Sequence, residues 1–191
     1  MSALYHYPEP GCPGSVKITA FTFQWDISKT VSIYYSKDKP MESQNIRAFF
    51  LGTLTAERPM PFHKAVDEIF VAAPEDKAQF EADLKKEWDS ISTNLKTEMI
   101  NLMDDKGMSD IDFLKVAQEN LDYYLTGLSL SGTTMETSSD EDFSDLLDEM
   151  EDVVLDLEEY IMEEKFEATE TKEFKEVVQS LWTDMIEARS L

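Results

Sequence analysis

The sequence predicts an α+β fold, in which a small N-terminal antiparallel β-meander precedes about four amphipathic helices packed as a bundle. Over residues 16–25, and again over 30–35, apolar and polar residues alternate, which is the period of a half-buried strand. Beyond residue 60, apolar residues recur every three or four positions, which is the period of an amphipathic helix. The change of period divides the chain into a β-rich part at 16–57 and a helical part at 58–191.

The length of 191 residues favours one domain preceded by a short leader. Residues 1–15 are expected to form a flexible leader, because they are rich in the turn-forming residues proline and glycine. Residues 16–191 are expected to form the single α+β domain. The chain is 42% hydrophobic, which is enough for a sizeable core.

The first elements expected are two strands joined as a hairpin. The first strand places Phe21, Phe23 and Trp25 on one face. The second strand, over 30–35, alternates in the same way. A third strand of the meander is expected over 46–54, where the apolar run is also compatible with a short helix.

The helical part begins where the apolar period changes. The expected helices are a short one at 62–71, then helices at 74–107, 109–127 and 140–164, and a last one that carries residues 174–186. Gly107 suits a C-terminal cap, and Ser109 with Asp112 resembles a capping box. The apolar residues expected to be buried together are Trp88, Leu95, Met99, Leu147, Met150, Val154, Leu157, Val178, Leu181 and Trp182.

The negative charge of the chain is concentrated in its C-terminal half. With 17 Lys+Arg and 40 Asp+Glu, the net charge is -23. No lysine or arginine lies between Lys115 and Lys165, a stretch that contains 16 carboxylates. Surface helices usually mix both signs, because Glu–Lys pairs four residues apart stabilise a helix. The strongly acidic helix at 140–164 forgoes that support along its whole length.

No motif in the sequence indicates catalysis or a cofactor. The two histidines, His6 and His63, lie in no local arrangement with a nucleophile. Glycine-rich phosphate-binding motifs and zinc-ligand spacings are absent, and residues 102–107 depart from an EF-hand loop at its first position. We therefore expect a protein that is not an enzyme and has neither metal nor cofactor. A pair of carboxylates brought together by the fold is the one enzymatic alternative.

Location and ligand class also follow from composition. The single cysteine, Cys12, excludes a disulfide framework, and the N-terminus lacks the pattern of a signal peptide. A cytoplasmic protein is therefore expected. A chain this acidic is repelled by phosphates, so direct binding to nucleic acid or to a membrane surface is not expected.

The acidic face of the 140–164 helix is the candidate functional site. Its expected partner-binding residues are Asp145, Asp148, Glu149, Asp152, Asp156 and Glu159. Carboxylates three or four residues apart on a helix lie about 5–6 Å from each other, within a few ångströms of the phosphate spacing along one DNA strand. Such a face accelerates docking to a basic protein and is selected by that protein's own phosphate-binding groove.

The function expected is that of a non-enzymatic acidic binding protein that blocks a basic partner, namely a toxin, a nuclease or a nucleic-acid-binding protein. It acts either as an immunity or inhibitor protein or as a DNA mimic. In its size, acidity and lack of motifs, the chain resembles bacterial immunity proteins and phage DNA mimics, a resemblance of overall character that assigns no residue. The alternative is a structural or scaffold protein whose acidic face serves only solubility.

Overall fold

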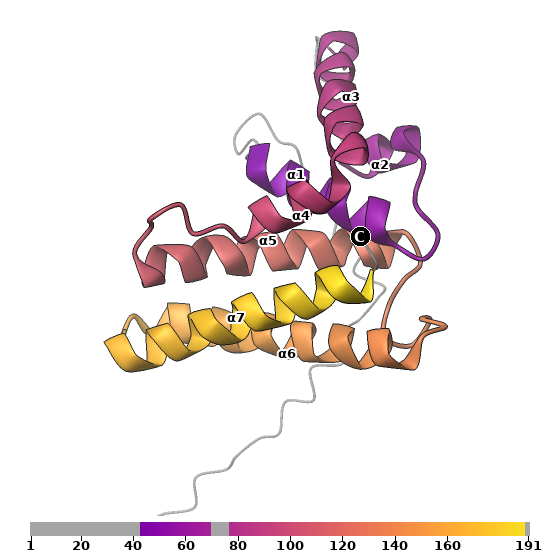
Figure 1. Cartoon of the computed structure of the whole chain (residues 1–191). Coiled ribbons are helices and arrows are strands. Elements are labelled where there is room, and N and C mark those ends of the chain that lie inside the picture. The colour runs from indigo at the N-terminus through magenta and orange to yellow at the C-terminus, as the bar shows by residue number, and fades with distance from the viewer. Residues whose placement is uncertain (1–42, 70–76, 190–191) are drawn as a thin grey trace, which may run out of the picture. The chain divides into compact units, whose positions relative to one another are not determined.

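The computed structural model describes residues 43–69 and 77–189, which belong to one compact unit, Ser32–Leu191. In this part of the chain 79% of the residues are helical. The helices are α1 (Ser43–Thr55), α2 (Phe62–Ile69), α3 (Lys77–Thr93), α4 (Leu95–Leu102), α5 (Asp110–Leu130), α6 (Glu141–Glu163) and α7 (Ala168–Ala188) (Figure 1).

The predicted α+β fold is wrong, because the described residues form seven helices and contain no strand. The segment 46–54, expected as the third strand of the meander, is the central part of α1. Four consecutive residues there, at 48–51, are fully buried. In a helix that is buried on several sides, the apolar residues no longer recur with a 3.6-residue period. Its sequence then resembles that of a buried strand. The leader at 1–15 and the hairpin at 16–35 lie outside the described residues.

The single helix expected over 74–107 is divided at Asn94 into α3 and α4. The Asn94 side chain donates to the Ser90 carbonyl at 3.1 Å, and the Thr93 hydroxyl donates to the Asp89 carbonyl at 2.7 Å. Such side chains offer backbone groups alternative partners and weaken a helix interior. The helical segment therefore breaks although its apolar period continues.

The ends of α5 and α6 follow local capping rules. Ser109 precedes α5, and its hydroxyl accepts a hydrogen bond from the Asp112 N–H at 3.2 Å, as the capping-box pattern predicts. Asp140 caps α6, because its side chain accepts a hydrogen bond from the Phe143 N–H at 3.3 Å. Gly127 does not end α5, which continues to Leu130.

One hydrophobic cluster joins the helices. Nine of the ten residues expected in the core are buried, and Leu95 is partly buried against them. Tyr124 of α5 and Trp182 of α7 pack edge to face with ring centroids 4.9 Å apart, and the Trp182 indole N–H donates to the Met99 carbonyl of α4 at 2.7 Å. These contacts hold α7 against α5 and α4. The helix α6 packs beside both α5 and α7 (Figure 1), and the buried residues of its apolar stripe leave its acidic side outside the core.

Candidate functional site

The acidic residues of α6 are positioned by the apolar stripe on its opposite side. This stripe is buried and consists of Phe143, Leu147, Met150, Val153, Val154, Leu157 and Tyr160. The remaining positions hold 11 carboxylates and no lysine or arginine. Acidic residues stabilise the first turn of a helix and destabilise its last turn through the helix dipole. Glu163, in the last turn of α6, therefore gains nothing from its position.

The six carboxylates predicted as the partner-binding site, Asp145, Asp148, Glu149, Asp152, Asp156 and Glu159, are all exposed. In the described part of the chain, none of them forms an ion pair. Asp148, Asp152 and Asp156 are four residues apart and lie on the outer side of α6. The structure thus brings the predicted residues together on one helix face, and among the residues it describes they have no ion-pair partner.

Two of the predicted residues, Asp145 and Glu149, also line a groove between α6 and α7. The groove has a volume of about 550 Å³ and is lined by Asp142, Asp145, Leu146, Glu149, Asp184, Glu187 and Ala188. Its α7 carboxylates, Asp184 and Glu187, were not foreseen from the sequence. The sequence predicts that both residues lie on the exposed face of a helix. It does not predict which helix packs beside that face.

The edge of α6 that borders α5 is also acidic. Burial together with the nearby Glu158 and Glu119 carboxylates raises the pKa of Asp122 above its usual value. Burial, followed by the charges of Asp148, Glu136 and Asp152, likewise raises the pKa of Glu151. The repulsion between like charges therefore extends from α6 onto its neighbouring helix.

We call the resulting set of side chains the acidic surface. It consists of the six predicted carboxylates together with Glu119, Asp122, Asp142, Glu151, Glu158, Asp184 and Glu187.

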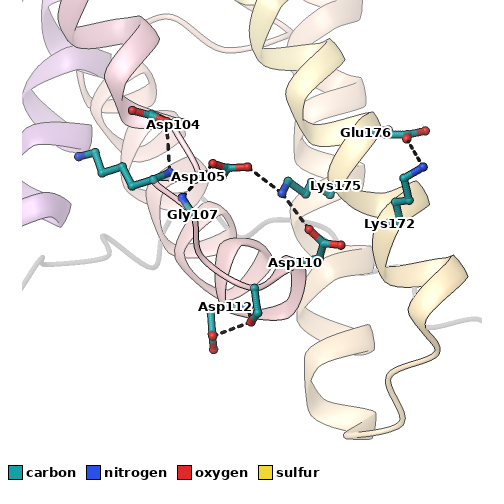
Figure 2. A network of polar contacts seen from close by, with 10 residues as sticks. Asp104, Asp105, Gly107, Asp110, Asp112, Lys172, Lys175 and Glu176 are labelled. Carbon is teal, nitrogen blue, oxygen red and sulfur yellow. Dashed lines mark hydrogen bonds and ion pairs between the residues drawn. The ribbon is translucent and has the colours of Figure 1, made fainter.

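Several basic side chains of the described residues pair with carboxylates outside the acidic surface. Lys175 Nζ binds Asp105 Oδ2 at 2.9 Å and Asp110 Oδ1 at 2.8 Å, which ties α7 to the segment before α5 and to its first turn (Figure 2). Arg47 of α1 pairs with Glu87 and Glu98. These cations join elements of the fold, and no ion pair between the described residues involves a carboxylate of α6.

The structure shows few features of an active site in the residues it describes. No group of three or more histidine, cysteine or acidic side chains there is arranged to hold a metal ion. His63 is exposed on α2. A second groove, of about 570 Å³ beside α2, is lined by both cations and anions, including Arg58, Lys64 and Asp67. Within the described ranges, every helix is too short or too polar to cross a bilayer.

Comparison with known proteins gives no match to a family model, to a curated protein or to a solved structure. The acidic surface is therefore the basis on which a function is proposed.

Proposed function

We propose that this protein is a non-enzymatic binding protein whose acidic surface docks onto a basic protein partner and blocks it. The partner is a nuclease, another toxin or a nucleic-acid-binding protein, whose own ligand is a polyanion. The observation that carries the proposal is the composition of α6, where 11 carboxylates stand with no basic side chain and ten of them are exposed.

This arrangement is costly for the fold, which argues against a role in solubility alone. Like charges three or four residues apart destabilise a helix, and the carboxylates of α5 and α7 add repulsion beside α6. Solubility requires only a net charge. A surface on which both signs are interspersed, with one sign in excess, provides it equally well. A concentrated anionic face is instead suited to attract a basic protein over a distance.

Blocking follows from occupation of the partner's groove. A groove that binds phosphates presents lysine and arginine side chains, and the carboxylates of α6 offer them acceptors at intervals of about 5–6 Å. Long-range attraction mainly raises the association rate, and short-range ion pairs then slow dissociation. We place the protein in the cytoplasm together with its partner, because the single cysteine gives no sign of an oxidising compartment.

The test compares the wild type with a triple variant, Asp148→Asn, Asp152→Asn and Asp156→Asn. The partner is first captured at low salt from a lysate of the producing organism, with the full chain as bait. Association rates are then measured for both proteins at two salt concentrations. We expect the triple variant to associate about tenfold more slowly at low salt, and this difference to shrink at high salt.

A charge-matched control separates the site from net charge. The control variant carries Asp67→Asn, Glu68→Gln and Glu173→Gln, which remove three exposed carboxylates outside the acidic surface. It is expected to associate within about twofold of the wild type, because its local field at α6 is unchanged. Equal association rates for the wild type and the triple variant at low salt would leave the acidic surface with the role of a scaffold's solubilising face.

A further inference from the structure

Two apolar side chains, Leu155 and Met162, interrupt the acidic outer side of α6. They are 43% and 70% exposed, so neither belongs to the buried stripe of the helix. Seven residues are almost two turns, which places both side chains on one side of α6 and about 10 Å apart along its axis. We call this pair the apolar row.

The apolar row is bordered by carboxylates. On a helix, the neighbours of a residue are those three and four positions away. For Leu155 all four neighbours are acidic: Glu151, Asp152, Glu158 and Glu159. Met162 shares two of them, Glu158 and Glu159, on its N-terminal side.

The negative border is widened by α5. Asp122 lies near enough to Glu158 for the two carboxylates to repel each other. On the other side of the row, Asp152 continues into Asp148 and Asp156 of the acidic surface. Leu155 and Met162 are thus an exposed apolar strip with negative charge along both of its edges.

We propose that the apolar row and the carboxylates beside it bind a basic amphipathic helix of the partner protein. Apolar residues repeated every seven positions and flanked by charges are the pattern with which one helix recognises another lying alongside it. The matching helix carries apolar side chains against Leu155 and Met162, and lysine or arginine on both edges against the carboxylates. This inference rests on the proposed function and specifies the chemistry of the partner's contact segment.

The charges around the row select this occupant over a second copy of the chain. Two copies pairing through α6 would bring the same carboxylates against one another, and like charges placed face to face across an interface cost several kcal/mol. If the partner's groove presented only lysine and arginine side chains, the apolar row would be left uncovered. A basic amphipathic helix complements both the row and its edges.

The experiment uses two synthetic 18-residue helical peptides of equal positive charge as probes. The first carries leucines at heptad spacing between lysine-rich edges, and in the second each leucine is replaced by glutamine. Their affinities for the full chain are measured by fluorescence anisotropy at low and moderate salt. The proteins compared are the wild type, the triple variant of the acidic surface, and the double variant Leu155→Gln, Met162→Gln.

A matched control variant carries Ile100→Gln and Val177→Gln, which change two other large apolar side chains, 53% and 44% exposed, on α4 and α7. All the substituted side chains are exposed, so each variant is expected to keep the helical circular-dichroism spectrum and the melting temperature within a few degrees of the wild type.

We expect the wild type to bind the leucine peptide about tenfold or more tightly than the glutamine peptide, since two apolar contacts are made only by the former. The Leu155 and Met162 double variant is expected to lose this preference and to keep its affinity for the glutamine peptide within about twofold. The Ile100 and Val177 control is expected to retain the preference. Added salt is expected to lower the affinity of the protein for both peptides by a similar factor.

Other results would overturn the inference in distinguishable ways. A preference that persists in the Leu155 and Met162 variant would exclude the apolar row as the contact, while a loss of both affinities in the triple variant would still support electrostatic docking. Unchanged affinities in the triple variant would remove the proposed function as well. A wild type that sediments as a dimer, with the double variant a monomer, would show that a second copy covers the row.

Discussion

Where α1 crosses α5, the backbones meet at two residues without side chains, Gly52 and Gly127. A Cβ atom on Gly52 would lie 2.1 Å from the Tyr124 carbonyl oxygen, and one on Gly127 would lie 2.4 Å from the Phe49 carbonyl oxygen. These are backbone atoms, which cannot rotate out of the way. Close to the crossing, the Thr55 and Tyr124 hydroxyls share a hydrogen bond of 2.8 Å, and burial raises the pKa of Tyr124 to about 12.

The substitution Gly127→Ala is expected to lower the free energy of unfolding by about 1–3 kcal/mol, because the added methyl group forces the two helices apart. Elsewhere in a helix, a change from glycine to alanine stabilises by about 1 kcal/mol. A loss of stability at residue 127 would therefore indicate the close approach of the two helices. Ser129→Ala, at an exposed position of α5, is the control and is expected to change stability by less than about 0.5 kcal/mol. Urea denaturation measures both. A Gly127→Ala variant as stable as the wild type would contradict the close approach of α1 and α5.

Among the helices, those with one buried face were predictable from sequence and those buried on several sides were not. The stripe of α6 has a clear period, and its carboxylates were therefore placed correctly on the exposed face. Residues 48–51 of α1 are all buried, so their apolar run shows no helical period in the sequence. The break between α3 and α4 at Asn94 depends on local hydrogen bonds, which the apolar period does not predict. Asp184 and Asp122 join the acidic surface through tertiary packing, which sequence periodicity does not encode.

The acidic outer side of α6 is expected to reduce the stability of the molecule through repulsion between like charges. Neutralising Asp148, Asp152 and Asp156 in the triple variant should therefore raise the free energy of unfolding by about 1 kcal/mol at low salt, at a few tenths for each pair removed. Added NaCl should raise the melting temperature of the wild type more than that of the variant, since screening relieves the same repulsion. Thermal melts of both proteins over a series of NaCl concentrations measure this. A wild-type melting temperature that falls from low to moderate salt would indicate that the face is compensated.

Across the whole molecule, two sets of carboxylates respond to pH in opposite directions. The Ser138 hydroxyl and the Ser139 N–H donate to Glu57 and lower its pKa, which fastens the end of α1 to the segment before α6. The Lys175 ammonium lowers the pKa of Asp105 in the same way (Figure 2). In contrast, the carboxyls of the α5–α6 side, Asp122 and Glu151, have raised pKa values, mainly through burial.

These opposite shifts predict a maximum of stability at mildly acidic pH. A carboxyl with a raised pKa takes up its proton in the folded state first, so stability rises as the pH falls from that pKa to the usual values of 3.8 for Asp122 and 4.5 for Glu151. A carboxyl with a lowered pKa acts in the opposite sense. The stability due to Glu57 and Asp105 is present above their usual values of 4.5 and 3.8, and it is lost as the pH falls below them.

Two variants separate these contributions in a series of urea denaturation curves from pH 7 to pH 3. Glu151→Gln should be more stable than the wild type at pH 7 and should gain less on acidification, because its side chain no longer carries a charge that burial and neighbouring carboxylates oppose. Glu57→Gln should be less stable at pH 7 and should lose less below pH 4.5, because the charge-assisted hydrogen bonds from Ser138 and Ser139 are already weakened. If the stability of the wild type instead fell continuously from pH 7, the carboxylates between α5 and α6 would not be the source of a repulsion that protonation relieves.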